Sequence, residues 1–370
     1  MEGPAEVTDL LYTEIESDLR ASVREVLDDK APWTDVLAGT EKDEPYDAAL
    51  WTAVAARLGC AGLPVPEDLG GAGAGWRETA VVMEELGRAV APVPFLTSSV
   101  LATAALLAAG ERELLGPLAA GDRIAVLAVP FGTAPGADPG SDPDAPTVSG
   151  ARSPARSRAS RRLAADVFLV PAAGGLYAVD ADPDGRHVRR TAVTSLDMTR
   201  RLADVAFTGA PARLVAQGPD AVRAALLTGA ALLASEQLGI AERCLDDTVA
   251  YVKTRYQFGR QIGSYQALKH RLADLWTSIT QARAAARYAA SCAAAGDADL
   301  PVAAAVAQAH CSAVAVKAAE ECVQMHGGIG FTWEHPAHLY LKRAKADSIA
   351  LGSPDRHRAA LAVLADLPPA

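Results

Sequence analysis

The sequence predicts a mainly α-helical protein with a small β domain in its centre. Apolar residues recur every three or four positions over the first part of the chain and again over the last part, as in helices buried on one face. Short β-rich runs separated by turn residues lie between these two parts. Because 370 residues exceed one small core, we expect three units: helical 1–122, β 123–213 and helical 214–370.

In the N-terminal unit, helical spacing is clear over 48–58 and 78–90. Between them, LPVPEDLGGAGAG at 63–75 is rich in proline and glycine, which prevents regular structure. The first 20 residues are acidic and amphipathic, without the basic flank and apolar core of a signal peptide. We therefore expect this unit to be helices joined by short loops, with no secretory leader.

The middle unit has four predicted strands, at 124–129, 167–170, 176–179 and 203–207, which should form a small sheet or β-barrel. A loop rich in Pro, Gly, Ser and Arg, over 132–162, interrupts them.

The C-terminal unit reads as long helices joined by short turns. Leu226, Leu233 and Ile240 mark one face, Leu268 to Ile279 mark a second at near-heptad spacing, and the Ala-rich segment 301–325 forms a third helix. This pattern predicts an antiparallel four-helix bundle. Its many alanines allow close helix approach and suggest a surface that another subunit covers.

Composition excludes several classes of function. The chain is half hydrophobic, and its net charge of −10 argues against nucleic acid and anionic membranes as partners. No apolar run reaches about 18 residues without a charge or breaker, so we expect no membrane span. The five cysteines show no CxxC pair or zinc-like spacing. A cytoplasmic protein with reduced thiols is the default expectation.

The first chemical motif is RYQFGRQIGSYQ at 255–266, a glycine-flanked turn between two long helices. Arg255 can fork onto a phosphate, Phe258 can stack on a flat base, and Gln266 can bond polar ring edges. A nucleotide-diphosphate grip and an ordinary helix corner explain these residues about equally well.

The second motif is QMHGGIGFT at 324–332, which ends the third long helix. Gln324 is followed by Gly327 and Gly328, and such glycines let backbone N–H groups approach a ligand closely. By itself this pattern is more often a helix C-cap than a binding site.

Together, the two motifs resemble those of the acyl-CoA dehydrogenase family. The RxxFGxxIxxxQ turn of that family is similar at Arg255, Phe258 and Gln266, and its QxxGGxG turn at Gln324, Gly327 and Gly328. The stretch LGCAGLPVPEDLGGAGAGWRETAVVMEELGRAVAPVP also resembles its first domain. The resemblance implies the acyl-CoA dehydrogenase fold, an acyl-CoA thioester as substrate, and FAD as cofactor. It further implies that these six residues hold the ADP part of an FAD that belongs largely to a neighbouring subunit.

The family's reaction requires a glutamate base, which this sequence lacks. In the family's commoner arrangement the base lies in a Tyr-Glu-Gly triplet beyond the GGxG turn, where this chain has Leu351. In the alternative arrangement it lies in a Glu-Arg pair before the RxxFG turn, where this chain has Gly229 and Ala230. Neither position can accept a proton, so we expect no catalytic residue in this chain and a loss of about 10²–10⁴ in rate.

The β unit departs from the family as well. The family's Thr-Glu-Pro-Gly-Ala-Gly-Ser-Asp-like run is reduced to VPFGT at 129–133 and a diffuse GADPGSDPDAP, and no tryptophan stands between Trp76 and Trp276. A degraded flavin-ring site beside an intact ADP grip suggests the glutamate-free subunit of a hetero-oligomer. Such chains are known among bacterial enzymes that act on bulky, steroid-like side chains, and FTWEHPAHLYLKRA at 331–344 looks similar to them.

Other polar residues have simpler interpretations. Glu334, His335 and His338 lack a third metal ligand nearby, so we expect no metal site. Glu236 could be a relocated base, but a cap or an ion pair within the bundle is favoured. Asp347 and Asp355 flank Leu351, and we expect neither to reach the pocket. A basic cluster in the middle loop could contact a CoA phosphate, but exposure of these side chains to solvent is the favoured interpretation. The cluster consists of Arg152, Arg156, Arg158, Arg161 and Arg162.

Three functions remain open from the sequence. The leading one is a base-deficient subunit that shares FAD with a glutamate-bearing chain and helps to oxidise an acyl thioester to its 2,3-enoyl product. The second is a self-sufficient homo-oligomeric flavoenzyme with a non-standard base or reaction. The third is a flavin-free scaffold that keeps only the fold.

Overall fold

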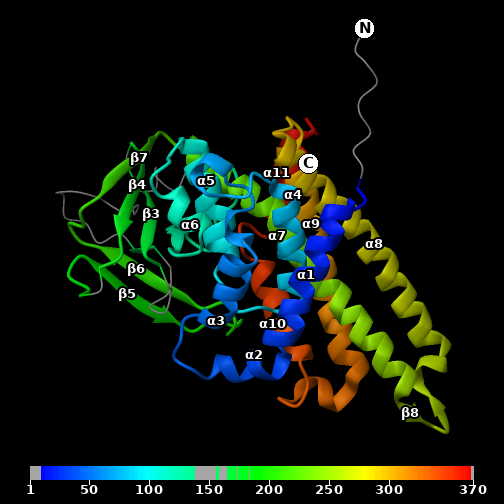
Figure 1. Ribbon diagram of the computed structural model, residues 1–370. Helices are drawn as coiled ribbons and strands as arrows, with labels where there is room; N and C mark the ends of the chain where they lie inside the picture. The colour runs from blue at the N-terminus through cyan, green and yellow to red at the C-terminus, as the bar shows by residue number, and fades with distance from the viewer. Residues whose placement is uncertain (1–9, 138–155, 158–164, 173, 183, 368–370) are drawn as a thin grey trace.

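A computed structural model describes residues 10–137, 156–157, 165–172, 174–182 and 184–367. In Figure 1 the β-sheets lie on one side of the N-terminal helices and the long C-terminal helices on the other. The fold class predicted from the sequence, mainly helical with a central β domain, is confirmed.

Short helices build the N-terminal part. Their bounds are α1 Glu14–Lys30, α2 Trp33–Thr40, α3 Ala48–Trp51, η1 Thr52–Arg57, η2 Cys60–Gly62, η3 Glu67–Leu69, α4 Trp76–Ala89, η4 Leu96–Ala102, α5 Thr103–Ala109 and α6 Leu115–Ala119. The helix predicted at 48–58 is present as α3 followed by a π-helical turn, η1, and the helix predicted at 78–90 is α4. A capping box starts α1, because the Glu16 amide donates to Thr13 Oγ1 at 3.2 Å and the Thr13 amide donates to Glu16 Oε2 at 2.7 Å.

Strands occupy the middle of the chain. Their bounds are β1 Ala125–Leu127, β2 Arg156–Ser157, β3 Val167–Ala172, β4 Gly175–Asp180, β5 Val188–Val193, β6 Leu202–Phe207 and β7 Arg213–Gln217. They form one sheet in the order β1-β3-β4-β7 and another in the order β2-β6-β5. The four predicted strands correspond to β1, β3, β4 and β6. Over the described residues these strands form two sheets that no hydrogen-bonded ladder joins, consistent with the predicted small sheet or barrel.

Long helices build the C-terminal part. Their bounds are α7 Asp220–Thr254, α8 Gln266–Ala295, α9 Leu300–His326, α10 Ala337–Asp347 and α11 Pro354–Leu364, with a short hairpin of β8 Tyr256–Gln257 and β9 Arg260–Gln261 between α7 and α8, the turn η5 Ile262–Ser264 after it, and η6 Gly327–Phe331 after α9. Alanines supply much of the buried surface of α8 and α9, so their backbones approach closely. The hydrophobic core runs continuously from α1 through the β domain to these helices.

Helices α4 and α7 touch through their backbones. A Cβ added at Gly239 of α7 would lie 1.9 Å from the Glu84 carbonyl oxygen, and a Cβ added at Gly87 of α4 would lie 2.1 Å from the Glu236 carbonyl oxygen. Side chains larger than glycine cannot be placed at either position without moving a helix. The N-terminal helices and the C-terminal bundle are therefore held together by backbone contact as well as by side chains.

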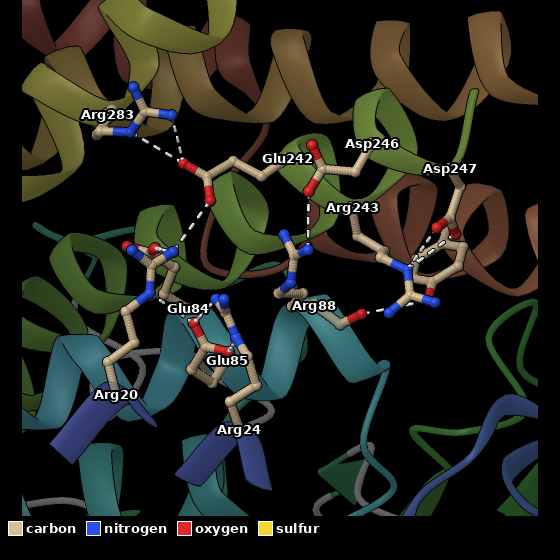
Figure 2. A network of polar contacts seen from close by, with 11 residues as sticks. Arg20, Arg24, Glu84, Glu85, Arg88, Glu242, Arg243, Asp246, Asp247 and Arg283 are labelled. Atoms are coloured by element: carbon tan, nitrogen blue, oxygen red, sulfur yellow. Dashed lines mark hydrogen bonds and ion pairs between the residues drawn. The ribbon is translucent and has the colours of Figure 1, made fainter. Parts of the chain in front are cut away.

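Ion pairs fasten α1 to this crossing (Figure 2). Arg20 of α1 reaches Glu84 at 2.7 Å and Glu85 at 2.8 Å on α4, and Glu242 at 3.3 Å on α7. Arg283 of α8 approaches Glu242 from the other side at 2.6 Å. Glu84 and Glu85 are each 1% exposed, so their charges depend on these arginine partners.

Two helices are long and apolar enough to cross a membrane. They are α7, and α9 together with η6, with peak windows of mean hydropathy 1.4 and 1.3. These windows are 89% and 67% buried inside the fold, as expected of core helices. The two helices are thus weak evidence for a membrane span.

Candidate functional site

A cavity lies where the three parts of the chain meet. Its walls come from the loop before α3, from the segment 92–101, from β1 and the residues after it, from the loop before β6 and the first residue of that strand, and from Ala350 and Leu351. Its volume is about 110 Å³, and most of its surface is apolar. VPFGT at 129–133 contributes Val129, Pro130 and Phe131 to this wall. The apolar character of this cavity suits hydrocarbon.

The two positions where a base was sought meet at this cavity. Leu351 is 4% exposed and has a left-handed backbone, with φ of 55°, and its amide donates to the Phe131 carbonyl oxygen at 3.0 Å. A Cβ added at Gly229 would lie 3.2 Å from Leu351 Cδ1 and 2.3 Å from Leu101 Cδ2. The place of a base is therefore filled by the hydrocarbon of two leucines.

The neighbouring carboxylates do not replace the missing base. Asp355 has a 91% exposed side chain and pairs with Arg358 at 2.7 Å, so it points to solvent. Asp347 is completely buried and accepts from Arg200 at 2.5 Å. Glu236 is 2% exposed and is bound by Arg200 from the cavity side.

A buried cluster of charges lies directly behind the cavity wall. Arg343 of α10 donates to Asp197 at 2.5 Å, to Glu236 at 2.6 Å and to Thr199 Oγ1 at 2.6 Å. Arg200 donates to both oxygens of Glu236, at 2.6 and 2.7 Å. The ion-pair interpretation of Glu236 is thus confirmed, and its carboxylate pairs with the buried Arg343 and with the partly exposed Arg200.

The carboxyl groups of this cluster have pKa values shifted in opposite directions. Burial raises the pKa of Glu236, but Arg200 and Arg343 outweigh it and hold that pKa below its usual range. Asp347 differs, because burial, followed by repulsion from Glu236, raises its pKa to about 8. Its Oδ2 has no hydrogen-bond partner among the described residues. At neutral pH the cluster then holds two arginines against two carboxylates and a neutral Asp347, so it carries no net charge.

Six predicted cofactor-binding residues gather at the far end of the bundle. The ring of Tyr251, on the last turn of α7, stacks on that of His326, the last residue of α9, with centroids 4.3 Å apart. This contact places the turn after α7 beside the turn after α9. All six residues are exposed, and they are Arg255, Phe258, Gln266, Gln324, Gly327 and Gly328.

The local geometry of both turns suits a ligand. Phe258 and Gly259 form the two-residue loop between β8 and β9, with φ of 52° and 79°, and the Phe258 side chain is 91% exposed. A non-glycine residue in this conformation is strained, which is typical of functional loops. A Cβ at Gly328 would meet nothing of this chain within 4 Å. The chain's own packing therefore does not require glycine there, whereas close approach of a phosphate would. These residues fit the ADP part of a dinucleotide.

His335 and His338 have separate partners. The His335 ring stacks on His326 with centroids 4.1 Å apart, and its Nδ1 accepts from the Ala337 amide. The His338 ring packs edge-on against Trp333. Among the residues that the structure describes, no group of three or more metal-ligating side chains assembles.

Several sequence predictions fall outside the described residues. Side chains of the loop arginines Arg152, Arg156, Arg158, Arg161 and Arg162 belong to this set, as does most of GADPGSDPDAP. Conversely, four residues of the buried charge cluster were not predicted from the sequence: Asp197, Thr199, Arg200 and Arg343. Their only sequence signal is an Asp-x-Thr-Arg-Arg run between two strands, which does not point to a partner in α10.

Comparisons with known proteins agree with this geometry. Residues 13–121 match the acyl-CoA dehydrogenase N-terminal domain, and 216–363 match the acyl-CoA dehydrogenase C-terminal domain. Acyl-CoA dehydrogenase IpdE2 of Mycobacterium tuberculosis is 39% identical over 345 residues, covering 91% of this chain and 92% of that protein.

Two solved structures are also similar along almost the whole chain. The ChsE4-ChsE5 complex from Mycobacterium tuberculosis has a TM-score of 0.84 at 27% identity, covering 98% of this chain and 100% of that one. A variant of the Tcur3481-Tcur3483 steroid ACAD has a TM-score of 0.83 at 30% identity, covering 95% and 98%.

Proposed function

Because this chain belongs to the acyl-CoA dehydrogenase family of FAD-dependent oxidoreductases, we propose that it is the subunit without a catalytic base in a hetero-oligomeric enzyme. In this proposal it holds the ADP part of an FAD whose flavin ring serves a glutamate-bearing partner. The assembly would oxidise an acyl-CoA thioester to its 2,3-enoyl product. The single observation that carries the proposal is the contact between Leu351 and the Gly229 position, where the family would have a base.

The two halves of the chemistry would then lie on different chains. FAD supplies the hydride acceptor when it is bound. In this chain Arg255 would pair with a phosphate, Phe258 would stack on a flat ring, and the amides near Gly328 would donate to phosphate oxygens. The proton of the α-carbon has no acceptor beside Leu351, so it must be removed by a carboxylate of the partner.

The comparisons support a two-chain assembly and a bulky substrate. Both similar solved structures carry double names, ChsE4-ChsE5 and Tcur3481-Tcur3483, and the second is described as a steroid ACAD. By similarity, we propose a second acyl-CoA dehydrogenase-like chain as partner and an acyl-CoA with a bulky, steroid-like group as substrate. The five cysteines are all free and buried, which suits a reducing cytoplasm. We also propose that the boundaries between the three domains lie near residues 122 and 213.

Visible flavin absorbance tests the proposal most directly. The chain should be nearly colourless when purified alone and should retain FAD when purified with a glutamate-bearing acyl-CoA dehydrogenase-like chain. A yellow protein that is bleached by an acyl-CoA in the absence of a partner would instead indicate a self-sufficient homo-oligomeric flavoenzyme. A protein that remains colourless with every such partner would indicate a flavin-free scaffold.

Substitution of a residue that is predicted to bind the ADP part of FAD makes the test specific. Arg255→Ala should lower the FAD retained by the assembly by about tenfold or more, the equivalent of one charge-assisted hydrogen bond of about 1.5–3 kcal/mol. Arg57→Ala is the matched control, since Arg57 is exposed on η1 and belongs to neither turn. Equal FAD content in the two variants would contradict the assignment of Arg255 to the ADP-binding site.

A further inference from the structure

The two turns proposed to hold the ADP part of FAD stand at the carboxyl ends of two long helices. Helix α7 ends at Thr254, immediately before Arg255. Helix α9 ends at His326, immediately before Gly327. The carboxyl end of a helix carries a partial negative charge, which repels an anion. Helix α8 also begins at this end of the bundle, but the hairpin β8–β9 and η5 separate its first residue, Gln266, from the end of α7. A diphosphate bound here therefore requires positive charge beside the ends of α7 and α9.

His326 is fixed at this place by contacts on both faces of its ring. The residue is 4% exposed, and its ring stacks on Tyr251 of α7 with centroids 4.3 Å apart and on His335 with centroids 4.1 Å apart. Its Nδ1 atom donates to the Cys322 carbonyl oxygen at 2.7 Å, and the Cys322 sulfur lies 3.6 Å from the same nitrogen. These contacts set the position and the orientation of the ring at the end of α9.

The surroundings of His326 favour its charged form. Because a carbonyl oxygen only accepts, Nδ1 keeps its proton, and Nε2 is the nitrogen that titrates. Burial lowers the pKa of His326, but hydrogen bonds with Cys322 outweigh burial and raise that pKa above its usual value. Hydrogen bonds, first from Cys244 and then from His326, in turn outweigh burial and lower the pKa of Cys322. Cys322 lies one helical turn, about 6 Å, deeper in α9, so the pair presents its positive side to the two turns.

His335 does not share this charge. Burial, followed by repulsion from His326, lowers the pKa of His335. Its Nδ1 accepts from the Ala337 amide at the start of α10, a bond that requires an unprotonated nitrogen. The stack therefore holds a single positive ring, that of His326. The titratable groups that face this ring are Tyr251 and Asp247 of α7, Cys322 of α9 and His335, and Asp247 is itself paired with Arg243 at 2.8 Å (Figure 2).

The charge lies close to the proposed phosphate position. His326 precedes Gly328 by two residues, so their Cα atoms are at most about 7 Å apart. A Cβ at Gly327 or at Gly328 would meet nothing of this chain within 4 Å, so the space beside this turn is open to a ligand. At such a distance a unit charge in a partly buried place changes the affinity for an anion by about three- to tenfold.

We propose that the imidazolium of His326 is a positioning residue for the diphosphate of FAD, whose binding it favours by compensating the negative carboxyl ends of α7 and α9. It acts through space, beside Arg255 and the Gly328 amide, and does not touch the reacting atoms. The inference rests on the proposed function, because it assumes that the two turns hold the ADP part of FAD. The affinity for FAD is then highest where His326 is protonated and falls as the pH rises through the pKa of this residue.

Titration of the chain into FAD, followed by the anisotropy of flavin fluorescence between about pH 5.5 and about pH 9, tests the proposal. The diphosphate diester of FAD keeps its charge over this range, so a change in affinity reports on the protein. We expect the dissociation constant of the unaltered chain to rise by about three- to tenfold with pH. His326→Gln carries no charge, and it should bind FAD at every pH as weakly as the unaltered chain does at the alkaline end.

Two further variants separate charge from packing. His335→Gln is the matched control, because it removes the other histidine of the stack without removing a charge, and it should keep the pH dependence. Cys322→Ala leaves the His326 ring in place but removes a hydrogen bond that raises the pKa of His326, so the pH dependence should move to lower pH. Thermal melts verify that each variant is folded, and the Cys322→Ala shift decides the matter if His326→Gln is not tolerated.

The inference would be overturned by equal FAD affinity at the two ends of the pH range, by a pH dependence that His326→Gln retains, or by one that Cys322→Ala leaves in place. Arg255→Ala distinguishes these outcomes from failure of the proposed function, since it should weaken FAD binding at every pH. If Arg255→Ala weakens binding and the affinity does not vary with pH, only the present inference is wrong. If FAD does not bind the chain at any pH, or binds Arg255→Ala equally well, the proposed function is wrong as well.

Discussion

Arg343→Leu should destabilise the protein strongly, and more so at higher pH. The Arg343 side chain is 2% exposed, and its guanidinium donates to Asp197, Glu236 and Thr199. Leucine fills much of the volume but leaves the two carboxylates with less compensation in a dry environment. Breaking a buried ion pair from one side costs about 3–5 kcal/mol, so we expect a loss of that size in the free energy of unfolding near neutral pH.

The loss in the free energy of unfolding caused by Arg343→Leu should depend on pH in a defined direction. In the unaltered chain the guanidiniums outweigh burial and lower the pKa of Asp197 and Glu236. The resulting stability is present above the unfolded pKa of about 4 and is lost as the pH falls through the folded pKa. In the variant, burial raises the pKa of these groups, so stability is lost as the pH rises above about 4. The difference between the two proteins should thus shrink on acidification, by up to about 1.4 kcal/mol per pH unit for each proton taken up.

Urea unfolding followed by circular dichroism at about pH 8 and about pH 5 measures both effects. Arg358→Leu is the control, because the Arg358–Asp355 pair is exposed and should contribute less than about 1 kcal/mol. The reasoning would be refuted by a loss in Arg343→Leu no larger than in the control, or by a loss that does not change with pH.

Three further outcomes are expected. Asp347→Asn should change stability by less than about 1 kcal/mol near pH 6, because burial raises the pKa of Asp347 to about 8 and the amide replaces a neutral acid. The variant should also lack the part of the wild-type stability loss that accompanies a rise in pH from about 4 to about 8, and urea titrations across this range check both statements. Leu351→Glu should cost about 2–4 kcal/mol and restore no activity to the isolated chain, since a carboxyl next to Leu101 has no partner; an acyl-CoA-dependent reduction of added FAD would contradict this. Arg20→Ala should cost about 2–3 kcal/mol and speed amide exchange in α1, whereas Lys30→Ala, which removes only an exposed pair with Asp29, should do neither.

Local signals in the sequence predicted much of the fold. The strands β3 and β4 were predicted because each contains a short apolar run with valine and an aromatic residue, and turn residues separate the two runs. Strand β5, Val188–Val193, was missed because VRRTAV carries two arginines and is mostly exposed, so its apolar alternation is weak. Half of the helix predicted at 48–58 is π-helical, a distinction that apolar spacing does not make.

Local signals in the sequence likewise predicted the part of the site that is built from short turns. Arg255, Phe258 and the glycines after Gln324 stand in short turns, where each residue's role depends on its immediate neighbours. The cluster behind the cavity is different, because Arg343 and Asp197 are 146 positions apart and meet only in the folded chain. Neither hydrophobic periodicity nor turn residues predict such a contact between distant parts of the chain. The meeting of Gly229 with Leu351 likewise required the packed bundle, although both positions were identified separately.

The paired glycines where α4 crosses α7 bear on how such chains can be recombined. Because a Cβ at Gly87 or at Gly239 would overlap a carbonyl oxygen of the opposing helix, each helix fits only a partner with glycine at this crossing. A chimera that takes its N-terminal third from a relative would succeed only if the donor carries a residue without a side chain at the same crossing. Exchange of the two helices together should be tolerated, whereas exchange of either one alone should not. The crossing thus makes α4 and α7 a single unit of inheritance, even though the 130 residues from 90 to 219 lie between them in the chain.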